Sequence, residues 1–466
     1  MNRPVFASKV RRTKCCTDRG WSPIQDSAVS WYNRHTAGTS KGPAAGELGR
    51  LSVMSMRRFA LQMLSLVSPA SQRWATPVFA SSTPTVKAAK ANKELVVGKG
   101  IQNMFIPLET ASGTKAKLSM GRRDEKDFEV CGYYKGAKVV SGDYWDFQSI
   151  NARYHYFIKC DISGKGVSAA LIMVQVATMV INYFNEWKKA MPRNIDLTDI
   201  TYKINDFIEE RGFVGRFAAL TLGVWDSEAG EAYLCEAGDT KLHLWDSRRG
   251  VLVTEDLPDS PAAGMFPSFM VQLKTPFTQV RRKLEHGDAL LLYTDGIEEA
   301  KRHFRDERFE VIACEAVPKD SDHENHKGGE NVEEFGPERI SAVLEAVERK
   351  AVYRLEKRHN PMGRELLSFD FSACRGSMPE KVIALLSVEK VFRMYPDPSA
   401  DESDTIMVDD KIDAFLAEHF DQYRLYCSNK KPFVDPQNES PGQFLYAKMK
   451  EDDQYDDLTF LAIRRK

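Results

Sequence analysis

The chain has 466 residues, which is more than one typical domain holds, so two or three folded units are expected. Its composition is 42% hydrophobic, 28% charged and 10% aromatic, as in ordinary globular proteins. These values exclude a collagen, a wholly disordered chain and a disulfide-dense miniprotein.

The formal net charge of -1 hides an uneven distribution along the chain. The first 90 residues carry 14 basic and 3 acidic residues, which leaves 51 basic and 63 acidic residues in the remainder. Because that larger part is net acidic, it lacks the basic surface that binds phosphate backbones. Nucleic acid is therefore not an expected partner.

The eight cysteines form no Cys-x-x-Cys pair, and the nine histidines form no His-Glu-x-x-His motif. Scattered cysteines of this kind are usually buried apolar residues, so the pattern predicts a protein of the reducing cytoplasm and no structural zinc site. The longest apolar run, residues 169–181, is too short to cross a bilayer and predicts a buried helix. No transmembrane segment is expected.

Three regions follow one another along the chain. Residues 1–85 are basic, poor in acids and without a sustained period, which predicts a partly disordered region. Residues 86–110 read as a linker helix and a segment that leads into the next region. Residues 111–466 then form one domain, interrupted by an insertion at about 301–450.

In this domain, short β-rich runs bounded by Gly, Asp or Ser predict strands, and two longer apolar-periodic stretches predict helices. The predicted strands are 128–134, 154–162, 217–225, 231–236, 241–245, 289–293 and 459–463. The predicted helices are 167–187 and 197–211. Strands, two helices and strands again indicate an α+β fold with mostly antiparallel sheets covered by helices.

The insertion has a different predicted secondary structure from the rest of the domain. Residues 318–334 are polar and interrupted by glycine, which predicts a mobile loop. Apolar residues at helical spacing predict helices over 340–357, 381–395 and 411–420, so the insertion is expected to be large and helical.

Chemistry is expected from aspartates that stand at strand ends beside glycine or hydroxyl residues. They occur in the runs GDYWD, CDISGKG, YTDG and DDLT, at Asp143, Asp146, Asp161, Asp295, Asp456 and Asp457. Each motif alone has an ordinary structural explanation as a turn, a helix cap or an acidic loop. If they converge, their carboxylates repel one another unless cations neutralise them, and all-oxygen ligands favour Mg²⁺ or Mn²⁺ over zinc.

The order and local sequence of these blocks resemble the metal-dependent (PPM) protein serine/threonine phosphatases, in particular their SpoIIE/RsbU-like bacterial branch. The matching text is FEVCGYYKGAKVVSGDYWDF, YFIKCDISGKGVSAALIM, RFAALTLGVWD, LEHGDALLLYTDGIEEAK and DDLTFLAIRR. The resemblance implies an α/β/β/α sandwich with two ions, Mn²⁺ or Mg²⁺, in a cleft at one edge.

The resemblance also implies a role for each site residue. Asp161 would bridge both ions, the Ile162 carbonyl would bind one of them, and Asp295 and Asp456 would bind the second. Asp143 would be the first acidic position of the site and Asp457 its close neighbour, and both are also expected to be metal ligands. Asp143, Asp161 and Asp295 are the expected catalytic residues. Cys160, inside an apolar strand, is expected to be a core residue and not a nucleophile.

The implied activity is hydrolysis of phosphoserine or phosphothreonine by a metal-activated water, without a covalent phosphoenzyme. In this branch the usual substrate is a phosphorylated STAS-type anti-sigma factor antagonist, whose dephosphorylation releases a partner switch in signal transduction. The 161 residues from Asp295 to Asp456 exceed the family pattern, and the surplus is expected to form a lid, a substrate-docking surface or a homodimer contact.

Two other functions are compatible with the sequence. One is a catalytically inert module of the same fold that binds a partner through residues 361–450. The other is a cation-binding structural protein, although the chain lacks any Asp-rich loop repeat. The full set of acidic residues favours the enzyme, because an inert descendant has no physical reason to retain mutually repelling carboxylates.

Overall fold

The computed structural model describes residues 94–109, 119–213, 215–306, 308–312, 331–360, 363–397, 405–433, 443–454 and 456–466. The chain divides into two units, Met1–Ser82 and Thr83–Lys466, and every described residue belongs to the second. The prediction of disorder for residues 1–85 therefore lies outside the described residues. Of the predicted linker helix, residues 94–102 are helical.

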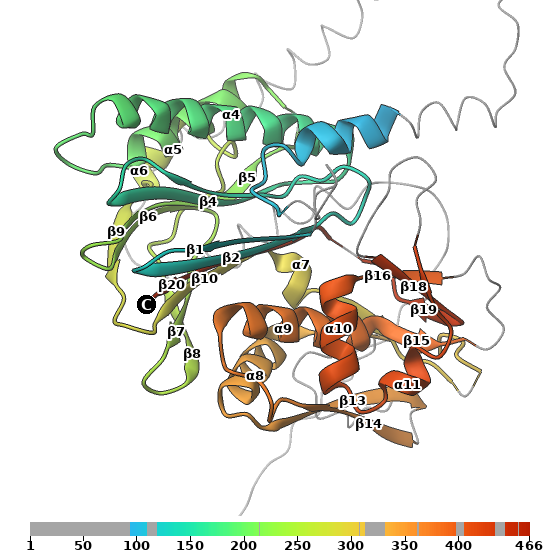
Figure 1. Ribbon diagram of the computed structural model, residues 1–466. Coiled ribbons are helices and arrows are strands. Elements are labelled where there is room, and N and C mark those ends of the chain that lie inside the picture. Colours follow the sequence, from blue (N-terminus) through green and yellow to red (C-terminus); the bar gives the residue numbers. More distant parts are fainter. Residues whose placement is uncertain are drawn as a thin grey trace, which may run out of the picture. The chain divides into compact units, whose positions relative to one another are not determined.

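Two antiparallel sheets form the centre of the unit (Figure 1). The first has the order β3-β4-β5-β6-β9, with β3 (Tyr144–Ser149), β4 (Tyr154–Ile162), β5 (Ala218–Asp226), β6 (Glu231–Ala237) and β9 (Gln279–Lys283). The second has the order β1-β2-β20-β10-β7-β8, with β1 (Met120–Asp124), β2 (Phe128–Lys135), β20 (Leu458–Arg465), β10 (Ala289–Tyr293), β7 (Lys241–Asp246) and β8 (Val251–Asp256). Every strand predicted between residues 128 and 293, and the final one, is present.

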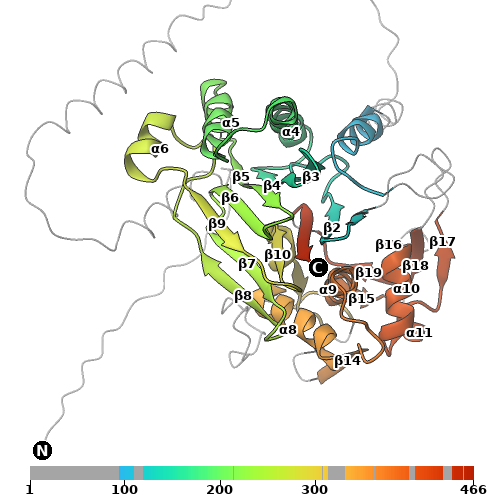
Figure 2. The same ribbon diagram turned by 60° about the vertical axis from the view of Figure 1, so that its left-hand side comes forward.

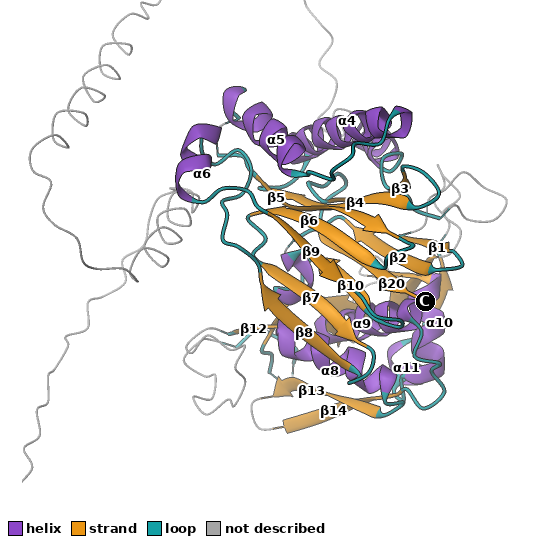
Figure 3. Ribbon diagram, turned by 90° about the vertical axis from the view of Figure 1, so that its left-hand side faces the viewer, coloured by secondary structure: helices purple, strands orange, loops and turns teal. Residues whose placement is uncertain are grey.

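Helices cover the outer face of each sheet, as Figures 1 and 3 show. The first sheet carries α4 (Val167–Lys189), α5 (Thr198–Glu210) and α6 (Ser268–Lys274). The second carries α8 (Gly336–Glu348) and α9 (Met378–Arg393), while the short α7 (Asp295–Glu298) follows β10 directly. The order helix, sheet, sheet, helix confirms the predicted α/β/β/α sandwich, which Figure 2 shows from a second side.

Helix α4 is long and apolar enough to cross a membrane by length and composition alone. In the structure, Ala169, Met173, Val176, Val180 and Phe184 are buried and recur every three or four residues. This spacing places them on one helix face, which packs against β4 in the interior. The contacts are those of the buried core helix that the sequence predicts.

The two sheets pack through a tryptophan that lies against glycine. Trp145 of β3 is 2% exposed, and a Cβ atom added to Gly132 of β2 would lie 2.3 Å from its indole ring. Gly121 of β1 meets the same ring, at 2.9 Å from an added Cβ atom. Because these glycines have no side chain, the large ring fits between the sheets without a void.

The insertion contains strands as well as helices, so its predicted helical character is only partly right. Besides α8 and α9, it includes β11 (Lys301–His303), β12 (Val332–Glu334), β13 (Val352–Asn360), β14 (Gly363–Asp370), β15 (Met394–Pro396), β16 (Thr405–Asp409), α10 (Asp410–His419), α11 (Tyr423–Tyr426), β17 (Lys430–Pro432), β18 (Gln443–Ala447) and β19 (Met449–Glu451). Most of the predicted 318–334 loop lies outside the described residues, but residues 332–334 form a strand.

The helix predicted over 340–357 is wrong in its second half. Helix α8 ends at Glu348, and the hairpin of β13 and β14 begins at Val352. Lys350 at the junction has a positive φ of 52°, a left-handed conformation that ends the helix. Apolar residues at 352 and 355 fit a helical period by coincidence, and the cross-strand pairing of this hairpin decides the structure instead.

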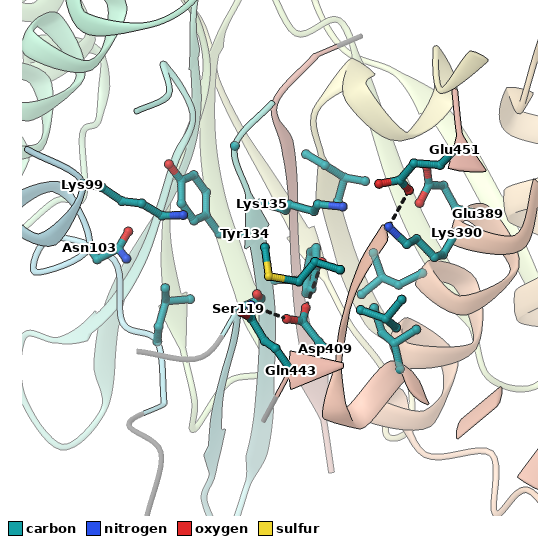
Figure 4. Close-up of a pocket in the computed structure, with 18 residues that line it drawn as sticks. Lys99, Asn103, Ser119, Tyr134, Lys135, Glu389, Lys390, Asp409, Gln443 and Glu451 are labelled. Atoms are coloured by element: carbon teal, nitrogen blue, oxygen red, sulfur yellow. Dashed lines mark hydrogen bonds and ion pairs between the residues drawn. The ribbon is translucent and has the colours of Figure 1, made fainter. Parts of the chain in front are cut away.

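The insertion shares a hydrophobic core with the second sheet. Leu291 of β10, Phe335, Val382 of α9 and Phe415 of α10 are all buried in this core. On another side, the insertion borders a cavity of about 260 Å³ that also touches the helix of residues 94–102 and the end of β2. Figure 4 shows Lys99 on one side of this cavity and the Lys390–Glu451 ion pair on the other.

We expect Gly132→Ala to destabilise the protein, because the new methyl group would overlap the Trp145 ring between the sheets. Overpacking of this kind costs about 1–3 kcal/mol in the free energy of unfolding, measurable by urea denaturation. Gly100→Ala is the matched control, since nothing lies within 4 Å of an added Cβ at this helical position. It should be neutral or stabilising, and equal losses for both variants would contradict the packing argument.

Candidate metal centre

Strand pairing in the first sheet brings two of the predicted aspartates to one edge. Strand β3 begins at Tyr144, β4 ends at Ile162, and Tyr144 pairs with Cys160 in the antiparallel register. The start of one strand therefore lies beside the end of the other. Asp143 and Asp161 are neighbours at that edge because of this register.

The second sheet supplies the remaining aspartates by the same geometry. Strand β10 ends at Tyr293, β20 begins at Leu458, and Tyr293 pairs with Phe460. Asp295 follows the end of β10, while Asp456 and Asp457 precede the start of β20, so all three lie at one edge.

A hydrogen-bonded threonine joins the edges of the two sheets. Thr294 donates from its hydroxyl to Oδ2 of Asp143 at 2.9 Å, and the hydroxyl accepts from the Thr459 N–H at 3.0 Å. Asp143 is 1% exposed, and its Oδ1 has no hydrogen-bond partner. A buried carboxylate oxygen without a partner is costly, which makes Oδ1 a candidate cation ligand.

Asp457 has a structural role besides the one that the resemblance implies. Its Oδ1 accepts the Ala137 N–H at 2.7 Å, and its Oδ2 accepts the Gly142 N–H at 2.9 Å. Both oxygens therefore hold the loop that leads from β2 to Asp143. Asp457 therefore supports this loop, and its place among the metal ligands stays a prediction.

Gly142 and Ile162 lie in close backbone contact beside the site. A Cβ atom added to Gly142 would lie 2.6 Å from the Ile162 carbonyl oxygen, so only glycine fits here. The chain then turns from β4 into α4 through Gly164 and Gly166, whose φ values are 82° and 78°. This turn carries Lys165, whose ammonium group lies 3.2 Å from an oxygen of Asp456.

The carboxylates raise one another's pKa. Burial, followed by the charges of Asp295 and Asp456, raises the pKa of Asp161 to about 7. The low-polarity surroundings and Asp456 raise the pKa of Asp295 to about 6. Burial and the Asp161 charge raise the pKa of Asp143 well above its usual value. The four groups, distant in sequence, thus share one electrostatic site.

The arrangement is looser than the coordination shell of an ion. Among the residues that the structure describes, no three His, Cys, Asp or Glu side chains converge closely enough to hold a metal. Mutual repulsion and the contact of Asp456 with Lys165 account for this spacing. The donors are all oxygen and one is unpartnered, so the set fits a hard divalent cation that would draw it together.

A cavity of about 300 Å³ opens beside Asp161 and Asp295. Its lining includes Lys159 and Asp239, which the sequence analysis did not identify. A signal for Lys159 is present, because it is a lysine within the apolar run YHYFIKCDI, two residues before Asp161. Asp239 follows β6 in a turn and carries no comparable signal.

Other residues near the site have structural roles. Cys160 is 0% exposed and burial raises its thiol pKa well above normal, which confirms it as a core residue. Asp146 accepts hydrogen bonds from the hydroxyls of Tyr144 and Tyr156, so it is satisfied within the first sheet. His155 stacks on Phe147 and is also part of the core.

The family described as stage II sporulation protein E (SpoIIE) matches residues 151–334, which contain Asp161 and Asp295. This match confirms the resemblance drawn from the sequence motifs. Over these residues the chain is similar to SpoIIE, a family to which the sequence motifs also point.

Individual relatives are distant. Protein IcfG of Synechocystis sp. is 25% identical over 240 residues, which are 46% of this chain but only 34% of that protein. The SiaA-PP2C domain of Pseudomonas aeruginosa aligns with a TM-score of 0.43 and 14% identity, covering 82% of this chain and 99% of that domain. The phosphatase domain of SpoIIE from Bacillus subtilis aligns with a TM-score of 0.39 and 10% identity, covering 90% and 100%.

We expect stability without divalent ions to fall as the pH rises from about 4 to about 7. The folded-state pKa of Asp161, about 7, exceeds its unfolded value, so the folded chain releases this proton at higher pH than the unfolded chain does. Asp161→Asn removes this penalty and should exceed the wild type at pH 8 by roughly 1–3 kcal/mol more than it does at pH 5.

Urea denaturation in chelator at both pH values measures this difference. The exposed Asp199, paired with Lys203 on α5, supplies the control variant Asp199→Asn, which should show no such dependence. A gain for Asp161→Asn that is equal at both pH values would contradict the electrostatic explanation.

Proposed function

We propose that the protein is a metal-dependent serine/threonine phosphatase. Asp161 would bridge two ions, Mn²⁺ or Mg²⁺, with the Ile162 carbonyl and Asp143 on one side and Asp295 and Asp456 on the other. The observation that carries this proposal is the placement of four aspartates from two sheets at one edge, where burial and neighbouring negative charges raise the pKa of Asp143, Asp161 and Asp295. Similarity to the SpoIIE family supports it.

When bound, such ions lower the pKa of a coordinated water and polarise the phosphoryl group. The chain's own residues would position this chemistry. Thr294 fixes one oxygen of Asp143, and the other oxygen is buried without a hydrogen-bond partner. Asp457 holds the loop before Asp143 through two backbone amides. Asp295 borders the cavity of about 300 Å³ and keeps solvent-accessible surface, so a phosphorylated side chain could reach the site.

The inert alternative is less well supported. A module that only binds partners has no use for carboxylates whose pKa values are raised by burial and by their neighbours' charges, because each one costs stability at neutral pH. Perturbed pKa values in an open cleft are typical of functional sites.

The proposed substrate is a phosphorylated regulatory protein, and similarity to the SpoIIE family supports a STAS-type anti-sigma factor antagonist in a partner-switching system. A cytoplasmic location and a homodimer remain predictions from the sequence. The insertion is then available as a lid, a substrate-docking surface or a dimer contact.

Hydrolysis of p-nitrophenyl phosphate in Mn²⁺ or Mg²⁺ tests the activity. We expect release of nitrophenol by the wild type, its loss in chelator, and a decrease of at least about 100-fold in Asp295→Asn, because one ion loses its carboxylate ligand. Asp146→Asn is the matched control, since Asp146 is bonded within the first sheet and should leave the metal dependence unchanged.

Activity that is indifferent to both chelator and Asp295→Asn would exclude the metal mechanism. Absence of activity in every metal, together with tight binding of a phosphoprotein partner to the full chain, would favour the inert module.

A further inference from the structure

A buried lysine lies beside the carboxylates of the proposed site. Lys159 and Asp161 are two residues apart on β4, so their side chains lie on the same face of the strand. Both line the cavity of about 300 Å³ that also borders Asp295. Lys159 is only 4% exposed, which is unusual for a lysine unless it is paired.

Asp239 fixes the position of this lysine. The Lys159 ammonium group lies 2.7 Å from Oδ2 of Asp239, and the Thr221 hydroxyl donates to the same oxygen at 2.6 Å. Thr221 lies directly opposite Lys159 in the pairing of β4 with β5. The two strands therefore present an ammonium and a hydroxyl group to one carboxylate, which holds the charge in place.

The Lys159 charge acts on the proposed metal ligands. It lowers the pKa of Asp161 and of Asp295, against the stronger effects that raise them. Among the other described residues that line the cavity, His243 does not share this role, because burial lowers its pKa to about 4 and leaves it neutral. Lys241 is exposed to solvent, which screens its charge.

We propose that Lys159, held by Asp239, is a fixed positive charge that weakens the binding of divalent ions at Asp161 and Asp295. This inference rests on the proposed function. The lysine partly neutralises the carboxylates when no ion is bound, so an ion gains less free energy on binding than it would in a wholly acidic site. Lys159 and Asp239 are thus positioning residues that set the ion concentration at which the site fills.

Two charge variants of the full chain test this inference, because they are expected to change the affinity for Mn²⁺ in opposite directions. Lys159→Met removes a positive charge and should tighten Mn²⁺ binding about tenfold, whereas Asp239→Asn leaves the lysine uncompensated and should weaken it about tenfold. The double variant keeps the net charge and should bind Mn²⁺ with nearly wild-type affinity. Free Mn²⁺ is measured by electron paramagnetic resonance at fixed pH and ionic strength.

Two controls separate charge from structure. Thr221→Val removes a hydrogen bond to Asp239 without changing charge, so it should shift the affinity far less than the tenfold expected of the charge variants. Lys390→Met breaks a buried ion pair with Glu451 in the insertion and should lower the melting temperature without changing Mn²⁺ affinity. If Lys159→Met does not fold, Asp239→Asn and the double variant retain the predicted difference.

The inference is overturned if the Lys159 and Asp239 variants shift the affinity in the same direction, or not at all, while the wild type binds Mn²⁺ and Asp295→Asn does not. A wild type that binds no Mn²⁺, or binds it independently of Asp295, would overturn the proposed metal site as well. The two failures are therefore distinguishable in one set of titrations.

Discussion

The structure depends on one electrostatic constraint, which is that carboxylates from two different sheets must stand close together at one edge. Repulsion between these carboxylates opposes folding, and the hydrogen bonds and the ion pair around them offset this repulsion. Thr294 ties Asp143 to the opposite sheet, Asp457 accepts two loop amides, and Lys165 contacts Asp456. Among the described residues, these contacts hold the acidic groups near one another but not in a closed coordination shell. The two divalent ions are part of the proposed function.

Strand β2 connects this edge to the insertion. Its end, at Lys135 and Gly136, lines the cavity of Figure 4, whose other walls are the helix of residues 94–102 and the insertion. The next residue, Ala137, donates its N–H to Asp457. The insertion also shares the core of the second sheet, so it is an extension of the phosphatase fold and not a separate appended domain. Changes at that cavity are therefore only a short stretch of backbone away from Asp143, a proposed metal ligand.

Local sequence predicted the sandwich well where packing agrees with periodicity. Helix α4 has buried residues every three or four positions, and β10 is buried along its whole length, so each was recognisable alone. The strand after Glu348 was not recognisable, because Val352 and Leu355 fit the spacing of a helix as well as that of a strand. Only the pairing with β14 selects the strand. Family likeness placed Asp457 among the ligands, whereas the fold gives both its oxygens to backbone amides.

The sequence by itself determined the kind of chemistry, because it fixes which residue types are present. These are aspartates at strand ends, beside glycines that permit close backbone contact. Only the tertiary structure decided how those groups act together. Whether a carboxylate faces a cation, an amide or an ammonium group depends on strand register and on the packing of two sheets, which bring together residues more than a hundred positions apart. The pairing of Lys159 with Asp239 is of this kind, since it follows from three adjacent strands and from no local motif.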